Sequence, residues 1–217
     1  MTEKIINLIN KTPDKPACYI LRGDSGDLLI DTGYFLCKPA VDAFVSRYNV
    51  KWIFLTHGHF DHSWNAKYLK EKYGCRIILH EKDRDLYQEH KYTLLKPTRK
   101  RYKMRTAAGN ILLKRLRPPA CEVDYYLTDR DTDFLRKLGF DAEIVMLPGH
   151  TAGCMGILAN DVLYAGDACS SVRAQYRTIY LAADVEAARE SEKKLRRLRP
   201  AVICAGHGSP IDFTKVE

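Results

Sequence analysis

The sequence predicts a layered α/β fold. Short apolar runs of strand length alternate along the chain with segments whose apolar residues recur at helical spacing, which is typical of sheets covered by helices. The chain has 217 residues, of which 46% are hydrophobic, so it can bury one sizeable core. We therefore expect a single domain over residues 1–217.

The predicted strands are the short apolar runs, each bounded by turn-forming or charged residues. They cover residues 4–9, 17–22, 27–31, 52–56, 76–79, 142–147, 153–158, 162–165 and 201–205. The predicted helices cover residues 38–48, 62–73, 81–89 and 184–198. The last helix is expected to begin after Asp184, which can cap it, and to end before Pro200.

Two strands follow the same plan. Residues 25–31 read SGDLLID and residues 159–167 read ANDVLYAGD, so each segment contains a hairpin turn, an apolar strand and a terminal aspartate. Two similar halves that each deliver an aspartate, Asp31 and Asp167, to a shared edge would suit a site between two sheets.

Residues 57–62 carry the strongest chemical signal. They read His57-Gly58-His59-Phe60-Asp61-His62, which places three imidazoles and one carboxylate in six residues. Imidazole nitrogen and carboxylate oxygen together suit zinc and iron, so the segment indicates a transition-metal site.

Two further histidines and two aspartates stand at the ends of apolar runs. His150 follows Gly149, and His207 lies between two glycines, in tight loops where backbone can approach a ligand closely. Asp31 and Asp167 each end a strand. His80 and His90 have no such context, and we expect them to be ordinary surface or core residues.

With these motifs the chain resembles the metallo-β-lactamase superfamily over about residues 4–212. The matching segments, in order, are Asp31-Thr32-Gly33, residues 57–62, Pro148-Gly149-His150-Thr151, Gly166-Asp167-Ala168 and Gly206-His207-Gly208. The resemblance implies a four-layer αββα sandwich. It also implies two metal ions, which we expect to be zinc, with iron and manganese as alternatives.

The resemblance implies a role for each site residue. One metal would be held by His57, His59 and His150, the other by Asp61, His62 and His207, with Asp167 as the bridge. Asp31 matches an aspartate that hydrogen-bonds a ligand histidine or a neighbouring loop, and so supports catalysis.

The expected chemistry is hydrolysis. A hydroxide between two metals would attack an ester, thioester or lactone carbonyl, with Asp61 as a ligand and a proton acceptor for the attacking water. Tyr34 and Phe35, just past Asp31, and Arg173 and Tyr176, just past Asp167, are predicted to line the substrate pocket because of their proximity in sequence to the motifs.

The segment 81–122 is predicted to be a basic insertion or lid. Between His90 and Ala120 it contains ten Lys or Arg residues and no acid, and it can account for the whole net charge of +8. Such a lid would favour a small anionic substrate. Alternatively, its charges could contact nucleic-acid phosphates while Tyr92 and Tyr102 stack on bases, or they could simply form a solvated helix face.

Within the superfamily, the motifs look closest to the glyoxalase II and lactonase group. Ser63-Trp64-Asn65 departs from the small residues and glycines common there, and the chain ends soon after His207, so we do not expect a dedicated glyoxalase II. The alternatives are a phosphodiesterase or nuclease of the same fold, an iron-dependent sulfur dioxygenase, and a metal-binding protein without catalysis.

The seven cysteines are scattered and form no C-x-x-C pair, which indicates reduced thiols and a cytoplasmic location. No apolar run approaches the length of a membrane span, so no membrane partner is expected. Nothing in the sequence indicates an oligomeric state.

Overall fold

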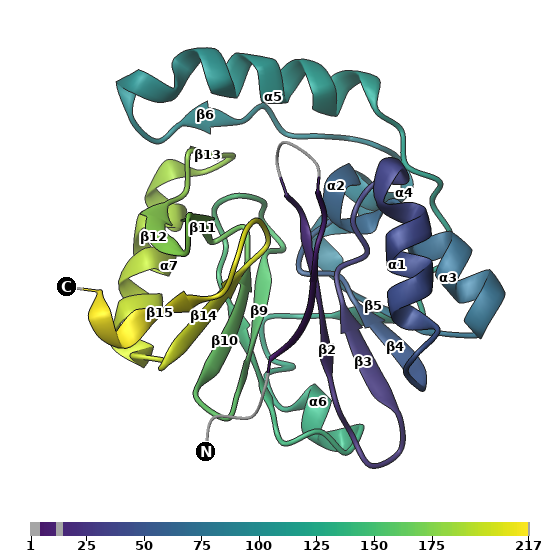
Figure 1. Ribbon diagram of the computed structural model, residues 1–217. Helices are drawn as coiled ribbons and strands as arrows, with labels where there is room; N and C mark the ends of the chain where they lie inside the picture. The colour runs from purple at the N-terminus through teal and green to yellow at the C-terminus, as the bar shows by residue number, and fades with distance from the viewer. Residues whose placement is uncertain (1–4, 12–14, 217) are drawn as a thin grey trace.

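The computed structural model describes residues 5–11 and 15–216. Two β-sheets pack face to face, and helices cover the outer face of each sheet (Figure 1). The four-layer αββα sandwich implied by the sequence is therefore confirmed.

The two sheets are mixed. The first contains, in spatial order, β1 (Ile6–Ile9), β2 (Ala17–Leu21), β3 (Asp27–Ile30), β4 (Val50–Phe54), β5 (Arg76–His80) and β7 (Tyr125–Leu127). The second contains β15 (Ile211–Asp212), β14 (Val202–Ala205), β10 (Val162–Gly166), β9 (Met155–Ala159) and β8 (Glu143–Met146). Two short pairs lie beside them: β11 (Cys169–Val172) with β12 (Gln175–Thr178), and β13 (Leu181–Ala182) with β6 (Lys96–Pro97).

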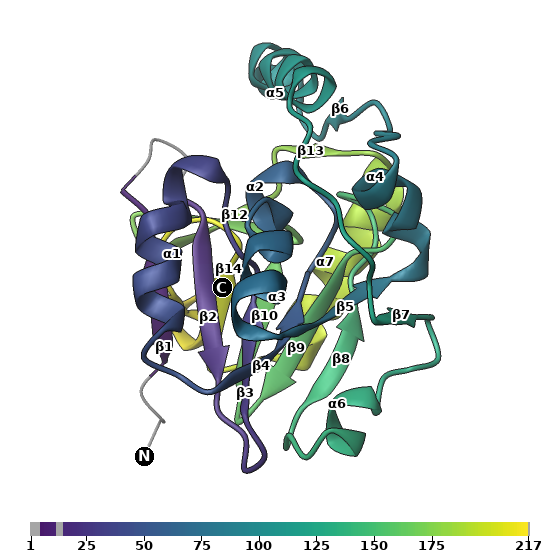
Figure 2. The same cartoon turned by 90° about the vertical axis from the view of Figure 1, so that its right-hand side faces the viewer.

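Seven helices surround the sheets in the described part of the chain. They are α1 (Lys38–Val45), α2 (Phe60–Ser63), α3 (Ala66–Tyr73), α4 (Arg84–Gln88), α5 (Lys103–Arg115), α6 (Phe134–Lys137) and α7 (Val185–Leu198). Helices α1, α3 and α4 cover the first sheet and α7 covers the second, as the two perpendicular views show (Figures 1 and 2).

The core follows the two-residue alternation of strand side chains. In β3, Leu28 and Ile30 point between the sheets, whereas Leu29 points outward beneath the helices. In β10, Tyr164 faces the space between the sheets and Leu163 packs toward α7. Since both faces of each sheet are buried, the central strands read as nearly continuous apolar runs, and this is why they were predictable.

The β1–β2 hairpin is joined to the loop after β14. The Ala17 N–H donates to the Gly206 carbonyl at 2.8 Å, the Gly208 N–H donates to the Lys15 carbonyl at 2.9 Å, and Pro16 forms an isolated bridge with His207. The two sheets are thus connected by backbone hydrogen bonds at the end that carries the histidines.

Most predicted elements are present with small shifts in their bounds. The strand predicted at 4–9 is β1, although Lys4 lies outside the described residues. The helix predicted at 62–73 is interrupted between α2 and α3, and the one at 81–89 begins as a 3-10 turn, Glu81–Asp83. Helix α7 begins after Asp184, whose side chain accepts hydrogen bonds from the N–H groups of Glu186 and Ala187.

Helix α5 was not predicted. Its apolar residues are distributed around the helix, so it lacks the one-sided pattern that identifies a helix in sequence. Met104 and Ile111 are exposed on its outer side, whereas Thr106 is buried toward the molecule.

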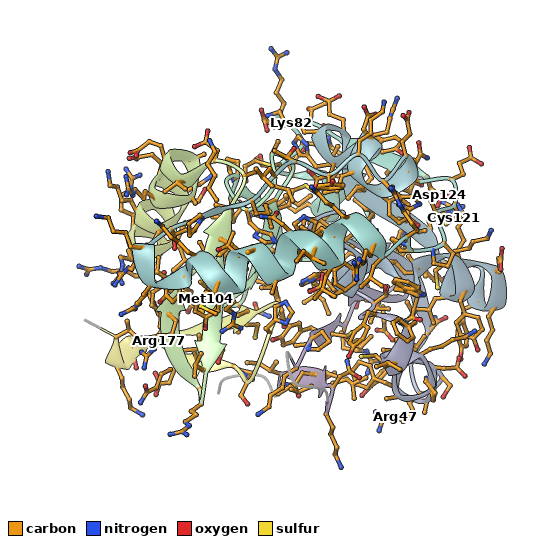
Figure 3. The ribbon with its side chains drawn as sticks, turned by 90° about the horizontal axis from the view of Figure 1, so that it is seen from above. Arg47, Lys82, Met104, Cys121, Asp124 and Arg177 are labelled. Carbon is orange, nitrogen blue, oxygen red and sulfur yellow. The ribbon has the colours of Figure 1, made fainter. Side chains whose placement is uncertain are left out.

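The segment 81–122, which we call the lid, connects β5 to β7, and α5 lies over the ends of both sheets (Figures 1 and 3). Strand β6 of the lid pairs with β13. Asn110 of α5 accepts from the Leu95 N–H at 3.0 Å and donates to the Leu95 carbonyl at 2.9 Å. The Thr98 hydroxyl donates to the Ile179 carbonyl at 2.6 Å.

No helix in the described ranges is long and apolar enough to cross a membrane. No disulfide joins two cysteines there either, in agreement with the scattered cysteine pattern.

Candidate metal centre

All seven predicted ligands meet at the end of the sandwich that the lid covers. They lie in loops or at the start of a helix directly after strands: His57 and His59 after β4, Asp61 and His62 in α2, His150 after β8, Asp167 after β10 and His207 after β14. Three overlapping groups have donor atoms within 4.8 Å of one another, namely His57-His59-His150, His57-His62-Asp167 and Asp61-His62-His207.

The first group consists of histidines alone. His59 Nδ1 lies 2.8 Å from His150 Nε2, and the His57 ring lies 4.8 Å from each of their rings, centroid to centroid. His57 is fully buried, and the other two are almost fully buried. Three imidazoles at these separations match the nitrogen donor set of a divalent transition metal.

The group Asp61-His62-His207 adds a carboxylate. His62 Nε2 lies 3.3 Å from His207 Nε2, and Asp61 Oδ2 lies 3.4 Å from His207 Nε2. Asp167 stands between the groups, with its carboxylate oxygens 3.5 Å from a nitrogen of His62, of His150 and of His207. This is the position that a carboxylate bridging two metal ions would need.

Asp31 fixes His62, one of the two histidines that belong to two groups. Its carboxylate accepts from Thr56 N–H and Thr56 Oγ1, both at 2.8 Å, and lies 2.8 Å from His62 Nδ1. Because the Thr56 hydroxyl donates to Asp31, it can only accept from His57 Nδ1, 3.1 Å away. Both imidazoles therefore hold a proton on Nδ1, and their Nε2 atoms are the ones left for a metal ion to bind.

Two buried atoms of the cluster have no hydrogen-bond partner: His57 Nε2 and Asp167 Oδ1. Leaving a buried polar atom unpaired costs about 1–3 kcal/mol, so such atoms are uncommon unless something else satisfies them. Both belong to the His57-His62-Asp167 group. The donor set thus fits a bound metal ion.

Burial and neighbouring charges lower the pKa of some ligand histidines and raise the pKa of others. Burial, together with neighbouring imidazoles, holds the pKa of His57 well below its usual value and lowers the pKa of His59 to about 3. Burial also opposes charge on His62, but the carboxylates of Asp31, Asp167 and Asp61 outweigh it and raise its pKa to about 9. Without a metal, His62 therefore carries a proton that a metal ion must displace.

Sequence reasoning missed Asp83, which connects two ligand loops. Its buried carboxylate accepts from Gly58 N–H at 2.9 Å, from Thr151 Oγ1 at 2.7 Å and from Gly153 N–H at 2.9 Å. A Cβ at Gly153 would lie 2.7 Å from Asp83 Oδ1, so the contact requires glycine there. The only signal in the sequence was an acid just after β5 in a segment read as a helix.

The departure at Ser63-Trp64-Asn65 has a structural explanation. The Ser63 hydroxyl donates to the His59 carbonyl at 2.8 Å, and the Asn65 amide donates to the carbonyls of Thr32 and Tyr34. These residues hold the ligand-bearing turn against the loop after β3.

A cavity of about 610 Å³ opens above the ligands. Of the four residues predicted to bind substrate, only Arg173 lines it. Tyr34 and Phe35 instead pack beside α2, where the Phe35 ring lies 5.1 Å from Trp64, and Tyr176 is buried against Phe213. These three residues therefore do not line this cavity, because closeness in sequence to a ligand does not determine the direction of a side chain.

Tyr102 is packed within the protein. Its ring meets Tyr180 edge-on at 5.0 Å, and the Arg105 guanidinium lies 4.2 Å above the Tyr180 ring. These contacts favour a packing role for Tyr102 over base stacking.

Comparison with known proteins gives a consistent picture. The family model of the metallo-beta-lactamase superfamily matches residues 12–207. The chain is 26% identical to the probable metallo-hydrolase YflN of Bacillus subtilis (strain 168), over 97% of this chain and 83% of that protein. It is 31% identical to the hydroxyacylglutathione hydrolase GloC of Haemophilus influenzae, over 74% of this chain and 70% of that protein.

Solved structures share the fold. The crystal structure of TTHA1623 in a di-iron-bound form superposes with a TM-score of 0.67 at 22% identity, covering 97% of this chain and 95% of that one. The family match spans nearly the whole chain and every ligand motif, and the αββα sandwich is shared with solved members. The chain therefore belongs to the metallo-beta-lactamase superfamily and is related to its metallo-hydrolases.

Proposed function

We propose that this protein is a dinuclear metallo-hydrolase that cleaves an ester, thioester or lactone carbonyl. The observation that carries the proposal is the convergence of seven imidazole and carboxylate side chains, five of which line one cavity, with donor atoms within 4.8 Å in three overlapping groups. We assign all of 1–217 to one domain with the lid at 81–122, and the cysteine pattern supports a cytoplasmic location.

His57, His59 and His150 are proposed to hold one metal ion, and Asp61, His62 and His207 the other. Asp167 would lie between the two ions. Two zinc ions bound there would polarise the substrate carbonyl and lower the pKa of a water molecule, so that it attacks at neutral pH. Iron and manganese are the alternatives, since these ligands suit them as well.

The remaining steps belong to side chains of this chain. Asp61 faces the cavity, and its carboxylate can accept the proton of the attacking water. Burial works against ionisation of Asp61, but the neighbouring His62 and His207 outweigh it and hold its pKa below the usual range, so it is ionised at neutral pH. Asp31 holds the His62 ring in place from behind and does not face the cavity.

A thioester is the preferred substrate group. The relative GloC is named a hydroxyacylglutathione hydrolase, which cleaves a thioester of an anionic carrier. The basic lid of this chain is consistent with an anionic carrier. The second candidate is a phosphodiester, favoured by the same lid charges, among which Arg105 lines the cavity.

The test compares two substrates on the same preparation. S-lactoylglutathione and bis(p-nitrophenyl) phosphate are assayed with metal-loaded protein, His150→Ala serves as the blank, and bound metals are counted by elemental analysis. We expect about two metal ions per chain and turnover of the thioester. Turnover of the phosphodiester alone would move the protein to the nuclease branch, and two bound metals without either activity would indicate a metal-binding protein.

A further inference from the structure

The cavity above the ligands has two unlike walls. The wall formed by the lid and by residues 179–181 is apolar: Leu95 and Ile179 are buried in place, and Leu112 projects from α5 with 49% of its surface exposed. The ligands His59, Asp61, His150, Asp167 and His207 form the floor.

Basic side chains stand at the rim of the cavity, one of them on the lid and two outside it. Lys15, Arg105 and Arg173 line it, and among the described lining residues the only carboxylates are Asp61 and Asp167 in the ligand cluster. Outside that cluster, the described lining combines apolar side chains, a few hydroxyl groups and these cations, with no acid to neutralise the cations.

A small polar acyl group would leave the apolar wall facing water. Burying apolar surface is favourable by about 25 cal/mol per Å². The exposed part of Leu112, together with the partly exposed Leu113 and Leu181, offers such surface in the cavity that the ligands line. An acyl chain placed along this wall would bring its carbonyl to the floor and leave the group beyond it at the basic rim.

We infer that the substrates are thioesters that join a medium-length apolar acyl chain to an anionic carrier. This assignment rests on the proposed hydrolase function and specifies its substrate class. In the reaction, the oxygen of water bonds to the acyl carbon and the C–S bond breaks. The thiolate that leaves takes up the proton lost by the water, so the products are a fatty acid and the free thiol.

Nucleotide recognition is less well supported at this site. Tyr180, which lines the cavity, has one ring contact with Tyr102 and another with the Arg105 guanidinium at 4.2 Å. An aromatic platform that is already occupied offers little surface for a base, whereas the aliphatic wall is uncovered.

The experiment measures kcat/KM for straight-chain coenzyme A thioesters and for the matching thioesters of neutral N-acetylcysteamine. Each added methylene should raise kcat/KM about fourfold until the wall is covered, because burying one methylene is worth about 0.8 kcal/mol. The coenzyme A series should also be cleaved faster than the neutral series at low salt, and this advantage should shrink as salt is added.

Matched variants test the apolar acyl chain and the anionic carrier separately. Leu112→Ser should flatten the dependence on chain length, whereas Leu36→Ser, at a leucine that is 62% exposed and outside the cavity lining, should preserve it. Arg173→Asn should reduce the preference for the anionic carrier and leave the chain-length dependence intact. Asparagine tolerates the left-handed backbone of this position, where φ is 54°.

The outcomes test the substrate class separately from the proposed hydrolase function. If thioesters are cleaved at rates independent of chain length, the hydrolase assignment stands and the apolar-chain assignment is wrong. Equal rates for thioesters of charged and of neutral carriers would show that the protein does not recognise an anionic carrier. If the metal-loaded protein cleaves no thioester of either series, the proposed function fails and this inference fails with it.

Discussion

The ligand cluster and the lid are held in place in very different ways. In the cluster, each imidazole that faces the cavity floor is buried or half-buried, and His57, His62 and His150 are oriented from behind by Thr56, Asp31 and the Leu181 carbonyl. Within the lid, Asp83 and Tyr87 are buried against the body of the protein. The part that carries α5 is held by the two-residue pair of β6 with β13, by a few hydrogen bonds and by the contacts of Tyr102 and Arg105 with Tyr180, and much of α5 is exposed. The chemistry thus sits on rigid strand ends, whereas substrate choice is assigned to a loosely attached segment.

The largest effect expected is loss of the metal centre. His150→Ala or Asp167→Ala removes a donor that no neighbour can replace, so metal content should fall and activity should disappear. Elemental analysis and turnover measure the two effects. The control His90→Ala, in the lid, should retain both, and full metal content together with full turnover in either ligand variant would show that the cluster is assigned incorrectly.

The next largest effect concerns Asp83. Asp83→Ala removes the acceptor shared by the loops of His59 and His150, so metal affinity and kcat should fall about 10- to 100-fold, as for other residues that orient ligands. Asp85→Asn, at an exposed acid of the same segment, is the matched control. A loss of affinity that is equal in the two variants would exclude a positioning role for Asp83.

The pH dependence of metal binding should be intermediate in size. The folded pKa of His62 is raised to about 9 when no metal is bound, so the metal competes with a proton at neutral pH. Affinity should therefore rise with pH, by about tenfold per pH unit for each proton displaced, and should level off once pH exceeds that pKa. Competition with a chromophoric chelator between pH 6 and 8 measures the slope, and a flat profile would contradict this protonation state.

The smallest effect should come from loosening the lid. Asn110→Ala removes both hydrogen bonds to Leu95, so local opening of α5 should become easier by about 1–3 kcal/mol. Hydrogen exchange of α5 should accelerate and KM should rise, with metal content unchanged. Lys114→Ala on the same helix is the control. A fall in metal content in Asn110→Ala would show that the lid and the cluster are not independent.

The strands and the ligand cluster could be predicted from the sequence because both depend on local patterns, whereas the four-layer arrangement was implied by the family resemblance. Buried strands read as apolar runs, and five strand ends carry a histidine or an aspartate. Glycine beside His207 is explained by the structure: a Cβ at Gly206 would lie 2.6 Å from His62 Cε1 and would collide with Asp167. The glycine at this position therefore indicated, in the sequence alone, that other groups approach the backbone closely here.

The remaining features depend on contacts between distant segments. Asp83 is close to Gly58 and Thr151 only after the chain has folded, and no spacing rule reports this. Helix α5 has no apolar stripe because it lies across an open cavity with apolar residues on more than one side. The direction of the Tyr176 side chain could not be predicted for a related reason. A hairpin of two short strands turns this side chain toward Phe213.

The backbone bridge between Pro16 and His207 has a consequence for how the protein is made. His57 and His59 leave the ribosome long before His207, yet the loop of His207 is held by hydrogen bonds to residues 15–17. Contacts of such high sequence separation form late, because the intervening chain must first be ordered. The complete set of seven donors therefore exists only once nearly the whole chain has been made and folded.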